Sequence, residues 1–155
     1  MRATTLTIDK LYGYLNKTVD FNTDINLLVG INGSGKTSVL NILNWILSPS
    51  LPHLAVTEFE RLELLFVYKE KEYLIEITQD DKTLLYKIKN ITDSKDYPPL
   101  TVRLKIPTSR LTQNETHKER FYKEYVGLGP DKDETETWAF IFYELPKPFV
   151  TVSYT

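Results

Sequence analysis

A glycine-rich stretch at residues 30–37 constrains the fold more than any other part of the chain. It reads G-I-N-G-S-G-K-T and matches the pattern G-x-x-x-x-G-K-[ST] at every fixed position. The nearly all-apolar run at residues 25–29 precedes it and is typical of a strand covered on both faces. Residues 36–47 follow with a narrow polar stripe at three- or four-residue spacing, which predicts a largely buried helix. We therefore expect a strand, a tight glycine loop and a helix in direct succession.

This succession is suited to binding a phosphate chain. Glycines allow backbone N–H groups to converge on phosphate oxygens without Cβ clashes, and the following helix directs its free N–H groups and positive dipole end at the same anion. Lys36 would bridge the terminal phosphates, and the Thr37 hydroxyl would bind Mg²⁺. The alternative is a Gly/Ser-rich turn that precedes Lys-Thr by chance. The predicted binding residues are Gly30, Ile31, Asn32, Gly33, Ser34, Gly35, Lys36, Thr37 and Ser38.

The remaining chain predicts a strand pair, a β-meander, one more helix and two final strands. The 155 residues fit one domain. Strands are expected at residues 6–10, 17–21, 62–68, 73–78, 84–89 and 102–106, with turns at 11–16, 69–72 and 79–82. Pro49 and Pro52 are expected to end the first helix. A capping box, Thr112-x-x-Glu115, predicts a second helix to about Val126, with a mobile loop at 131–137 and strands at 138–145 and 149–154.

The composition excludes several classes of protein. The chain has no cysteine, which rules out disulfides, cysteine nucleophiles and cysteine-ligated zinc and is compatible with the cytosol. The N-terminal sequence has no signal-peptide pattern, and no apolar run is long enough for a membrane span. We therefore expect a cytoplasmic protein without a membrane partner.

Residues 28–40, L-V-G-I-N-G-S-G-K-T-S-V-L, resemble the start of ABC-type ATPase heads of the SMC/RecF/OLD group, which are AAA-type P-loop NTPases. Asn32 before Gly33-Ser34-Gly35 is typical of that group, as is an N-terminal strand pair that ends in a residue such as Phe21. The resemblance is specific over residues 1–47 and vague beyond them. It implies an α/β, P-loop NTPase-like mixed sheet with an antiparallel β lobe.

On this resemblance, residues 1–155 are the N-terminal part of an ATPase head and a piece of a longer protein. Its parts are the strand pair, loop and first helix (1–48), the β-meander (58–107), a helix (112–127) and final strands (138–154). The resemblance further implies Mg·ATP binding and a head–head dimer in the complete protein. DNA repair, DNA maintenance and anti-phage defence are the processes in which such heads act.

The first turn departs from the family pattern. Many members carry Asn-Phe-Arg there, whereas this chain has Lys10-Leu11-Tyr12. Tyr12 or Tyr14 could stack on adenine, as aromatic residues do in transporter-type ABC domains. The alternative is a tyrosine that packs on the strand pair.

The catalytic half of such a head is missing from the sequence, and we assign no catalytic residue. The nearest match to the family's acidic strand, F-I-F-Y-E-L-P at residues 140–146, has Tyr143 in place of the aspartate and is interpreted as an ordinary core strand. No signature motif is present, and His53 and His117 are expected in a loop and a helix. Gln79, in a solvated turn, and Gln113 are weak matches to the family's sensing glutamine. A non-hydrolysing nucleotide sensor or assembly module and a small P-loop kinase are the alternatives.

Positive charge gathers in the middle of the chain. Residues 82–123 hold 10 Lys/Arg and 4 Asp/Glu, a net of +6, although the whole chain has a net charge of −2. Such a segment can mark a DNA-binding face, and the alternative is a set of solvated lysines. The aromatic residues Phe121, Tyr122 and Tyr125 are interpreted as the apolar side of the second helix, with Val126 beside them.

Overall fold

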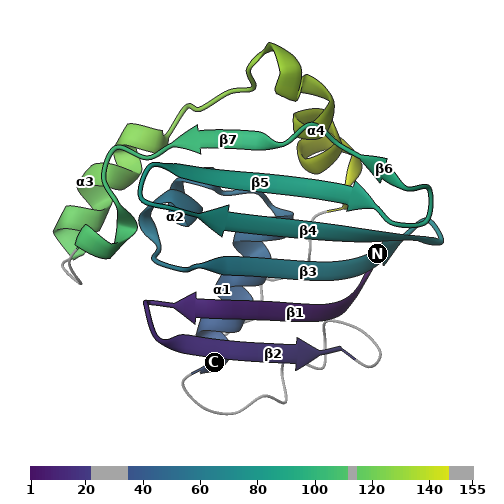
Figure 1. Ribbon diagram of the computed structural model, residues 1–155, viewed down its shortest axis with the longest axis horizontal. Helices are drawn as coiled ribbons and strands as arrows, with labels where there is room; N and C mark the ends of the chain where they lie inside the picture. The colour runs from purple at the N-terminus through teal and green to yellow at the C-terminus, as the bar shows by residue number, and fades with distance from the viewer. Residues whose placement is uncertain (22–34, 112–114, 147–155) are drawn as a thin grey trace.

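The structure is a computed structural model that describes residues 1–21, 35–111 and 115–146. Seven strands form one sheet in the order β2-β1-β3-β4-β5-β6, with β7 also paired to β5 (Figure 1). Every strand pair in these residues is antiparallel. The mixed sheet stays a prediction, because the strand expected at residues 25–29 lies outside the described residues. The strands are β1 (Arg2–Leu11), β2 (Leu15–Asp20), β3 (Arg61–Tyr68), β4 (Lys71–Gln79), β5 (Thr83–Asn90), β6 (Lys95–Asp96) and β7 (Leu100–Arg103).

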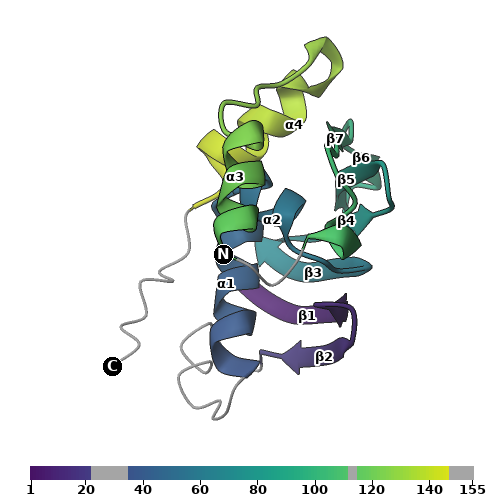
Figure 2. The same cartoon turned by 90° about the vertical axis from the view of Figure 1, so that its left-hand side faces the viewer.

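Helices cover one face of this sheet and leave the other face open (Figure 2). They are α1 (Gly35–Leu47), α2 (Leu51–Val56), α3 (Glu115–Tyr125) and α4 (Thr135–Ala139), with 3₁₀ turns η2 (Thr108–Arg110) and η3 (Lys132–Glu134) and the π-helix η4 (Phe140–Glu144). None of the helices in the described residues is both long and apolar enough to cross a membrane.

The β-meander forms where the sequence alternates between apolar and polar residues. In β3, Leu62, Leu64 and Phe66 are buried against the helices, while Arg61 and Glu63 lie on the open face and form an ion pair there. The same alternation continues along β4 and β5, which confirms three predicted strands. One buried and one wet face is the usual pattern of an antiparallel sheet packed on one side.

Helix α1 supplies the centre of the core. Its apolar side chains at six positions are at most 1% exposed: Val39, Leu40, Ile42, Leu43, Ile46 and Leu47. Asn44 is exposed, so the predicted polar stripe on a largely buried helix is confirmed. At the C-terminal end of the helix, the buried hydroxyl of Tyr86 in β5 donates to the Ile46 carbonyl at 2.7 Å. This bond satisfies one of the carbonyls that a helix end leaves without an intrahelical partner.

Helix α2 was not predicted, and His53 lies in it rather than in a loop. Pro52 occupies the first turn of α2, where its missing N–H costs nothing, so it begins this helix instead of ending the previous one. The His53 ring stacks on Trp45 of α1 at a centroid distance of 4.9 Å and also contacts Tyr122 of α3 at 4.7 Å. Contacts among these three rings therefore link α1, α2 and α3. Burial of the His53 ring lowers the pKa of His53.

The prediction of a mobile loop at residues 131–137 and a strand at 138–145 is wrong, because both segments are helical. Glu134 is buried and caps the turn: its carboxylate accepts from the Asp131 N–H at 3.0 Å and from the Thr101 N–H of β7 at 2.8 Å. Trp138 and Phe142 stack at 4.6 Å, which is the i, i+4 contact of a helix. The aromatic residues of this segment favoured a strand in the sequence analysis. The buried residues, however, recur at helical spacing, at Thr137, Phe140 and Ile141. The strand predicted at 149–154 lies outside the described residues.

Helix α3 ends at Tyr125 and β7 ends at Arg103, each earlier than predicted, and the capping residue Thr112 lies outside the described residues. The strand ends at Arg103 because the Lys105 N–H donates to the Tyr125 hydroxyl at 2.7 Å instead of to a neighbouring strand. Phe121 and Tyr122 are half-buried and Tyr125 is buried, as the sequence predicted. Val126 follows the end of the helix and is 58% exposed, so its predicted place on the apolar side of the helix is wrong. Gly127, at φ +90°, ends the helix in the left-handed conformation that glycine favours.

Replacement of Tyr86 by Phe should lower the free energy of unfolding by about 1–3 kcal/mol, because it leaves the buried Ile46 carbonyl without a partner. Urea denaturation followed by circular dichroism measures this change. Tyr14→Phe is the matched control, because Tyr14 is 74% exposed and should lose almost nothing. Equal stability of the two variants would show that the Tyr86 hydroxyl does not support the helix end.

Candidate functional site

The predicted phosphate site lies at the beginning of α1, although only part of it falls within the described residues. Helix α1 starts at Gly35, so the backbone of Gly35, Lys36 and Thr37 forms its first turn, as the glycine motif predicts. No acidic residue lies in this turn, so no side chain of its own opposes an anion at the positive helix end. Residues 30–34 and the side chains of Lys36 and Thr37 lie outside the described part of the chain.

The β1–β2 turn lies against the first turn of α1. The Tyr12 hydroxyl is 3.4 Å from the Ser38 hydroxyl, which joins two residues 26 positions apart. The Tyr12 ring is half-buried and packs against the core. The backbone N–H of Tyr12 donates to the Glu58 backbone carbonyl at 2.7 Å. The structure thus places Tyr12 next to the motif, while its role toward adenine remains a prediction. Tyr14 is 74% exposed and makes no comparable contact in the described residues.

The backbone of this turn is tightly constrained. Tyr12 has φ +59° and Gly13 has φ +87°, both in the left-handed region. The positive φ at Gly13 favours glycine, and a Cβ there would lie 3.2 Å from a carboxylate oxygen at the flexible end of the Glu58 side chain. The Lys10 N–H donates to the Asn16 side chain at 2.9 Å across the turn. These contacts hold Tyr12 at a fixed position beside α1.

The Gln79 side chain has a structural role, because it forms hydrogen bonds with several segments of the fold. Its prediction as a solvated turn residue is therefore wrong. It is the last residue of β4, and its side-chain N–H groups donate to the carbonyls of Leu54 at 2.7 Å and Thr57 at 2.8 Å. Its side-chain oxygen accepts from the Thr108 hydroxyl at 2.8 Å and from the Phe59 N–H at 3.5 Å. The amide is fully used in joining α2, β4 and η2, which leaves it no capacity to sense a magnesium-bound water. Gln113 lies outside the described residues.

The stretch that resembled an acidic strand is the π-helix η4, so it cannot serve as one. Tyr143 is 83% exposed, and Glu144 forms an exposed ion pair with Lys69 at 3.9 Å. Among the described residues no group of three or more His, Cys, Asp or Glu side chains could hold a metal ion. The magnesium ligand Thr37 therefore stays a prediction from the motif.

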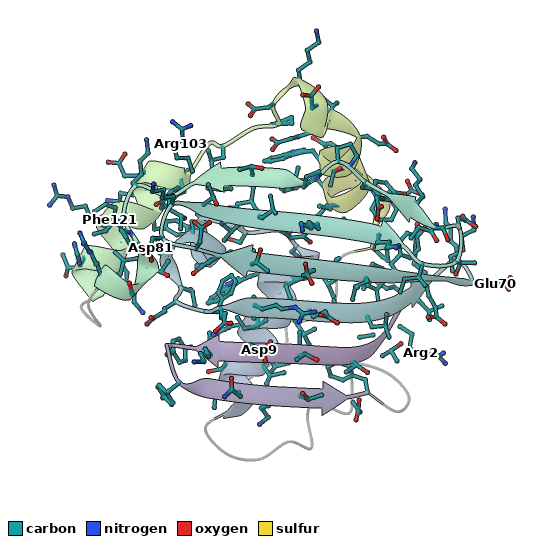
Figure 3. The ribbon with its side chains drawn as sticks, viewed as in Figure 1. Arg2, Asp9, Glu70, Asp81, Arg103 and Phe121 are labelled. Atoms are coloured by element: carbon teal, nitrogen blue, oxygen red, sulfur yellow. The ribbon has the colours of Figure 1, made fainter. Side chains whose placement is uncertain are left out.

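The positively charged segment is largely exposed. Lys95 pairs with Glu136 at 2.5 Å, but other cations of the segment extend into solvent from β7, the segment after it and α3. Figure 3 shows Arg103 near the end of β7. The exposed cations there are Arg103, Lys105, Arg110, Arg120 and Lys123. Phe121 and Tyr122 pack against the core and so do not form an outward stacking platform for bases.

Replacement of Gln79 by Leu should lower the free energy of unfolding by about 2 kcal/mol or more, because several buried polar groups lose their partner together. Chemical denaturation provides the measurement, and Thr108→Val, which removes one of these bonds, should cost less. A Gln79→Leu protein of unchanged stability that bound Mg·ATP more weakly would contradict the structural role.

Comparison with known protein families identifies the family of this chain. A search of curated proteins finds no match. The model of a family described as an AAA domain matches residues 5–138, which extend from β1 through most of α4 and include the glycine motif. This match covers most of the 155 residues. The chain therefore belongs to the AAA domain family and is an AAA-type, ATPase-like domain.

Proposed function

We propose that this chain is the Mg·ATP-binding N-terminal lobe of an ATPase head of the SMC/RecF/OLD type. The observation that carries the proposal is the contact between Tyr12 and Ser38. It sets the β1–β2 turn directly beside the first turn of α1, where the glycine motif ends. The membership of the AAA domain family supports nucleotide and Mg²⁺ binding in general terms. The finer assignment to this group of heads rests on the sequence of residues 28–40.

Each part of the site has a distinct task in this proposal. The backbone N–H groups of residues 30–35 and the N-terminus of α1 surround the phosphates, which a helix end without acidic residues favours. The Lys36 side chain supplies a positive charge to the terminal phosphates, and the Thr37 hydroxyl holds Mg²⁺. Bound Mg²⁺ would neutralise phosphate charge. Tyr12 offers its ring to the adenine from the side of the β1–β2 turn.

Hydrolysis in this proposal occurs in the complete protein, at a dimer of two heads. A second head would bring positive groups to the γ-phosphate, and these stabilise the charge of the transition state. The described residues contain no acidic strand, because residues 140–144 are helical. We place such a protein in the cytoplasm, with DNA repair, DNA maintenance or anti-phage defence as its process. The exposed cations of β7 and α3 are the surface that would meet DNA.

A second candidate is a nucleotide-binding module that does not hydrolyse ATP. The helical structure of residues 140–144 favours it, since the described residues then hold no carboxylate on a strand beside the motif. The γ-phosphate would act as a switch that orders the protein. A small P-loop kinase is the third alternative, and phosphate transfer from ATP to a small acceptor by the 155-residue chain would identify it.

The Lys36→Ala variant should bind Mg·ATP at least roughly tenfold more weakly than the parent chain, which corresponds to about 1.4 kcal/mol. Isothermal titration calorimetry with Mg·ATP gives both dissociation constants. Lys87→Ala is the matched control, because Lys87 is an exposed lysine on β5, away from α1. Unchanged affinity in Lys36→Ala would refute the phosphate-loop assignment.

Replacing Tyr12 by Ala should weaken ATP binding roughly fivefold or more, because base stacking on an aromatic ring contributes about 1–3 kcal/mol. The affinity for magnesium pyrophosphate, which has no base, should stay the same. Tyr12→Phe keeps the ring and loses only the hydroxyl near Ser38, so it should bind ATP almost normally. If ATP and pyrophosphate binding fall together, Tyr12 only supports the position of the turn and does not contact adenine.

A further inference from the structure

An open cleft of about 720 Å³ lies at the end of the sheet opposite to Tyr12. Tyr12 follows the last residue of β1, whereas the cleft borders the β3–β4 turn, which lies near the first residues of β1 because Arg2 pairs with Val67. Strand β6 and the helices α4 and η4 form its other walls. Figure 3 shows Glu70 of the β3–β4 turn at one end of the sheet and Asp81 of the β4–β5 turn toward the other. The cleft is thus separate from the proposed nucleotide site.

Aromatic rings line and support the cleft. Phe140 of η4 lies 4.8 Å from Tyr97 and 5.3 Å from Tyr73, measured between ring centroids, and Tyr68 lies 6.4 Å from Tyr73. Burial raises the pKa of Tyr73 and of Tyr97, so both phenols stay protonated near neutral pH. Neutral rings present the negative face of their quadrupole, which attracts cations and repels anions.

Two lysines of the chain already form cation–π contacts with these rings. The Lys69 ammonium is 5.2 Å from the centre of Tyr68, and the Lys95 ammonium is 4.6 Å from the centre of Tyr97. Both distances fall within the range of cation–π attraction. The rings of Tyr68 and Tyr97 therefore offer faces that accept a positive group at the cleft.

Two carboxylates complete the arrangement at the rim. Glu136 holds Lys95 at 2.5 Å, whereas Glu144 is 3.9 Å from Lys69. The side chain of Lys69 is 69% exposed and that of Glu144 is 52% exposed, so this longer pair contributes little to stability. A stronger cation from outside can displace Lys69 from Glu144 at small cost.

One wall of the cleft departs from regular helical geometry. Glu144 and Tyr143 belong to a π-helix, a form that is rare and frequent at functional sites. Lys69 and Glu70 have φ of +49° and +64°, which is the ordinary backbone conformation of a two-residue hairpin turn between the paired residues Tyr68 and Lys71. Tyr143 is 83% exposed, although its ring is large and apolar. An exposed aromatic ring beside a cleft is a common feature of residues that bind a partner.

We propose that this aromatic cleft binds an arginine side chain of a partner protein. The guanidinium would pair with Glu144 in place of Lys69 and contact the rings of Tyr68 and Tyr143, which both line the cleft. Arginine suits the site better than lysine, because its planar group pairs bidentately with a carboxylate, stacks on rings and is weakly hydrated. An anionic ligand at Lys69 would meet the negative face of the Tyr68 ring and the neighbouring Glu144 carboxylate.

The test is an NMR titration of the 155-residue chain with N-acetyl-arginine amide, without nucleotide. Saturable shifts of the ring resonances of Tyr68, Tyr97 and Tyr143 are expected, with a dissociation constant on the order of millimolar for so small a probe. N-acetyl-citrulline amide has nearly the same shape and no charge, so it should bind at least roughly fivefold more weakly. No ATP is present, so this result is independent of the proposed nucleotide function.

Variants locate the site. Tyr143→Ala and Glu144→Gln should each lower the affinity for N-acetyl-arginine amide roughly fivefold or more. Both residues are exposed enough to be replaced without loss of the fold. Tyr14→Ala, which removes an equally exposed ring far from the cleft, should leave the affinity unchanged. The proposal is overturned by a lack of saturation, by equal binding of citrulline, or by unchanged affinity in both cleft variants. Binding of N-acetyl-glutamate amide at the same rings would overturn it as well.

Discussion

The packing of α1 across the antiparallel sheet is the interaction on which the rest of the structure depends. Its apolar side chains are almost completely buried, and both of its ends contact strands or turns of the sheet. At the N-terminal end Ser38 meets Tyr12, and at the C-terminal end the Ile46 carbonyl accepts the Tyr86 hydroxyl. The helix therefore has a fixed position relative to β1 and β5. Because α1 begins at the glycine motif, this packing also sets where a bound phosphate would lie.

The features that the sequence predicts correctly have a strong local cause. Helix α1 follows from its polar stripe, and β3, β4 and β5 follow from alternating burial. The segments that it missed depend on contacts between distant residues. Pro52 begins a helix whose end is bonded to Gln79, and Glu134 orders its turn by accepting a hydrogen bond from Thr101. Such bonds join residues more than 20 positions apart, and no local pattern reveals them.

The same distinction applies to the candidate site. The motif at residues 30–37 can be read from the sequence because its glycines and Lys-Thr stand at fixed spacing. The position of Tyr12 beside Ser38 could only be suspected from family resemblance, since it depends on how the β1–β2 turn meets α1. Gln79 shows the opposite case: a residue type that suggested magnesium sensing is used entirely to hold the fold together. The aromatic cleft has no sequence signature, because its walls come from segments that are distant in the chain. The incorrect prediction of a strand at residues 138–145 also gave no reason to expect a cleft there.

The phosphate site at the start of α1 is tested most directly by mapping the backbone amide resonances of the chain during titration with Mg·ATP. We expect the largest shifts at residues 30–38, where N–H groups would donate to phosphate oxygens, and smaller shifts at Tyr12 and its neighbours in the β1–β2 turn. Residues of the aromatic cleft, such as Tyr97, should not respond. Saturable shifts that cluster at the cleft and leave residues 30–38 unchanged would contradict the account, as would the absence of any saturable shift.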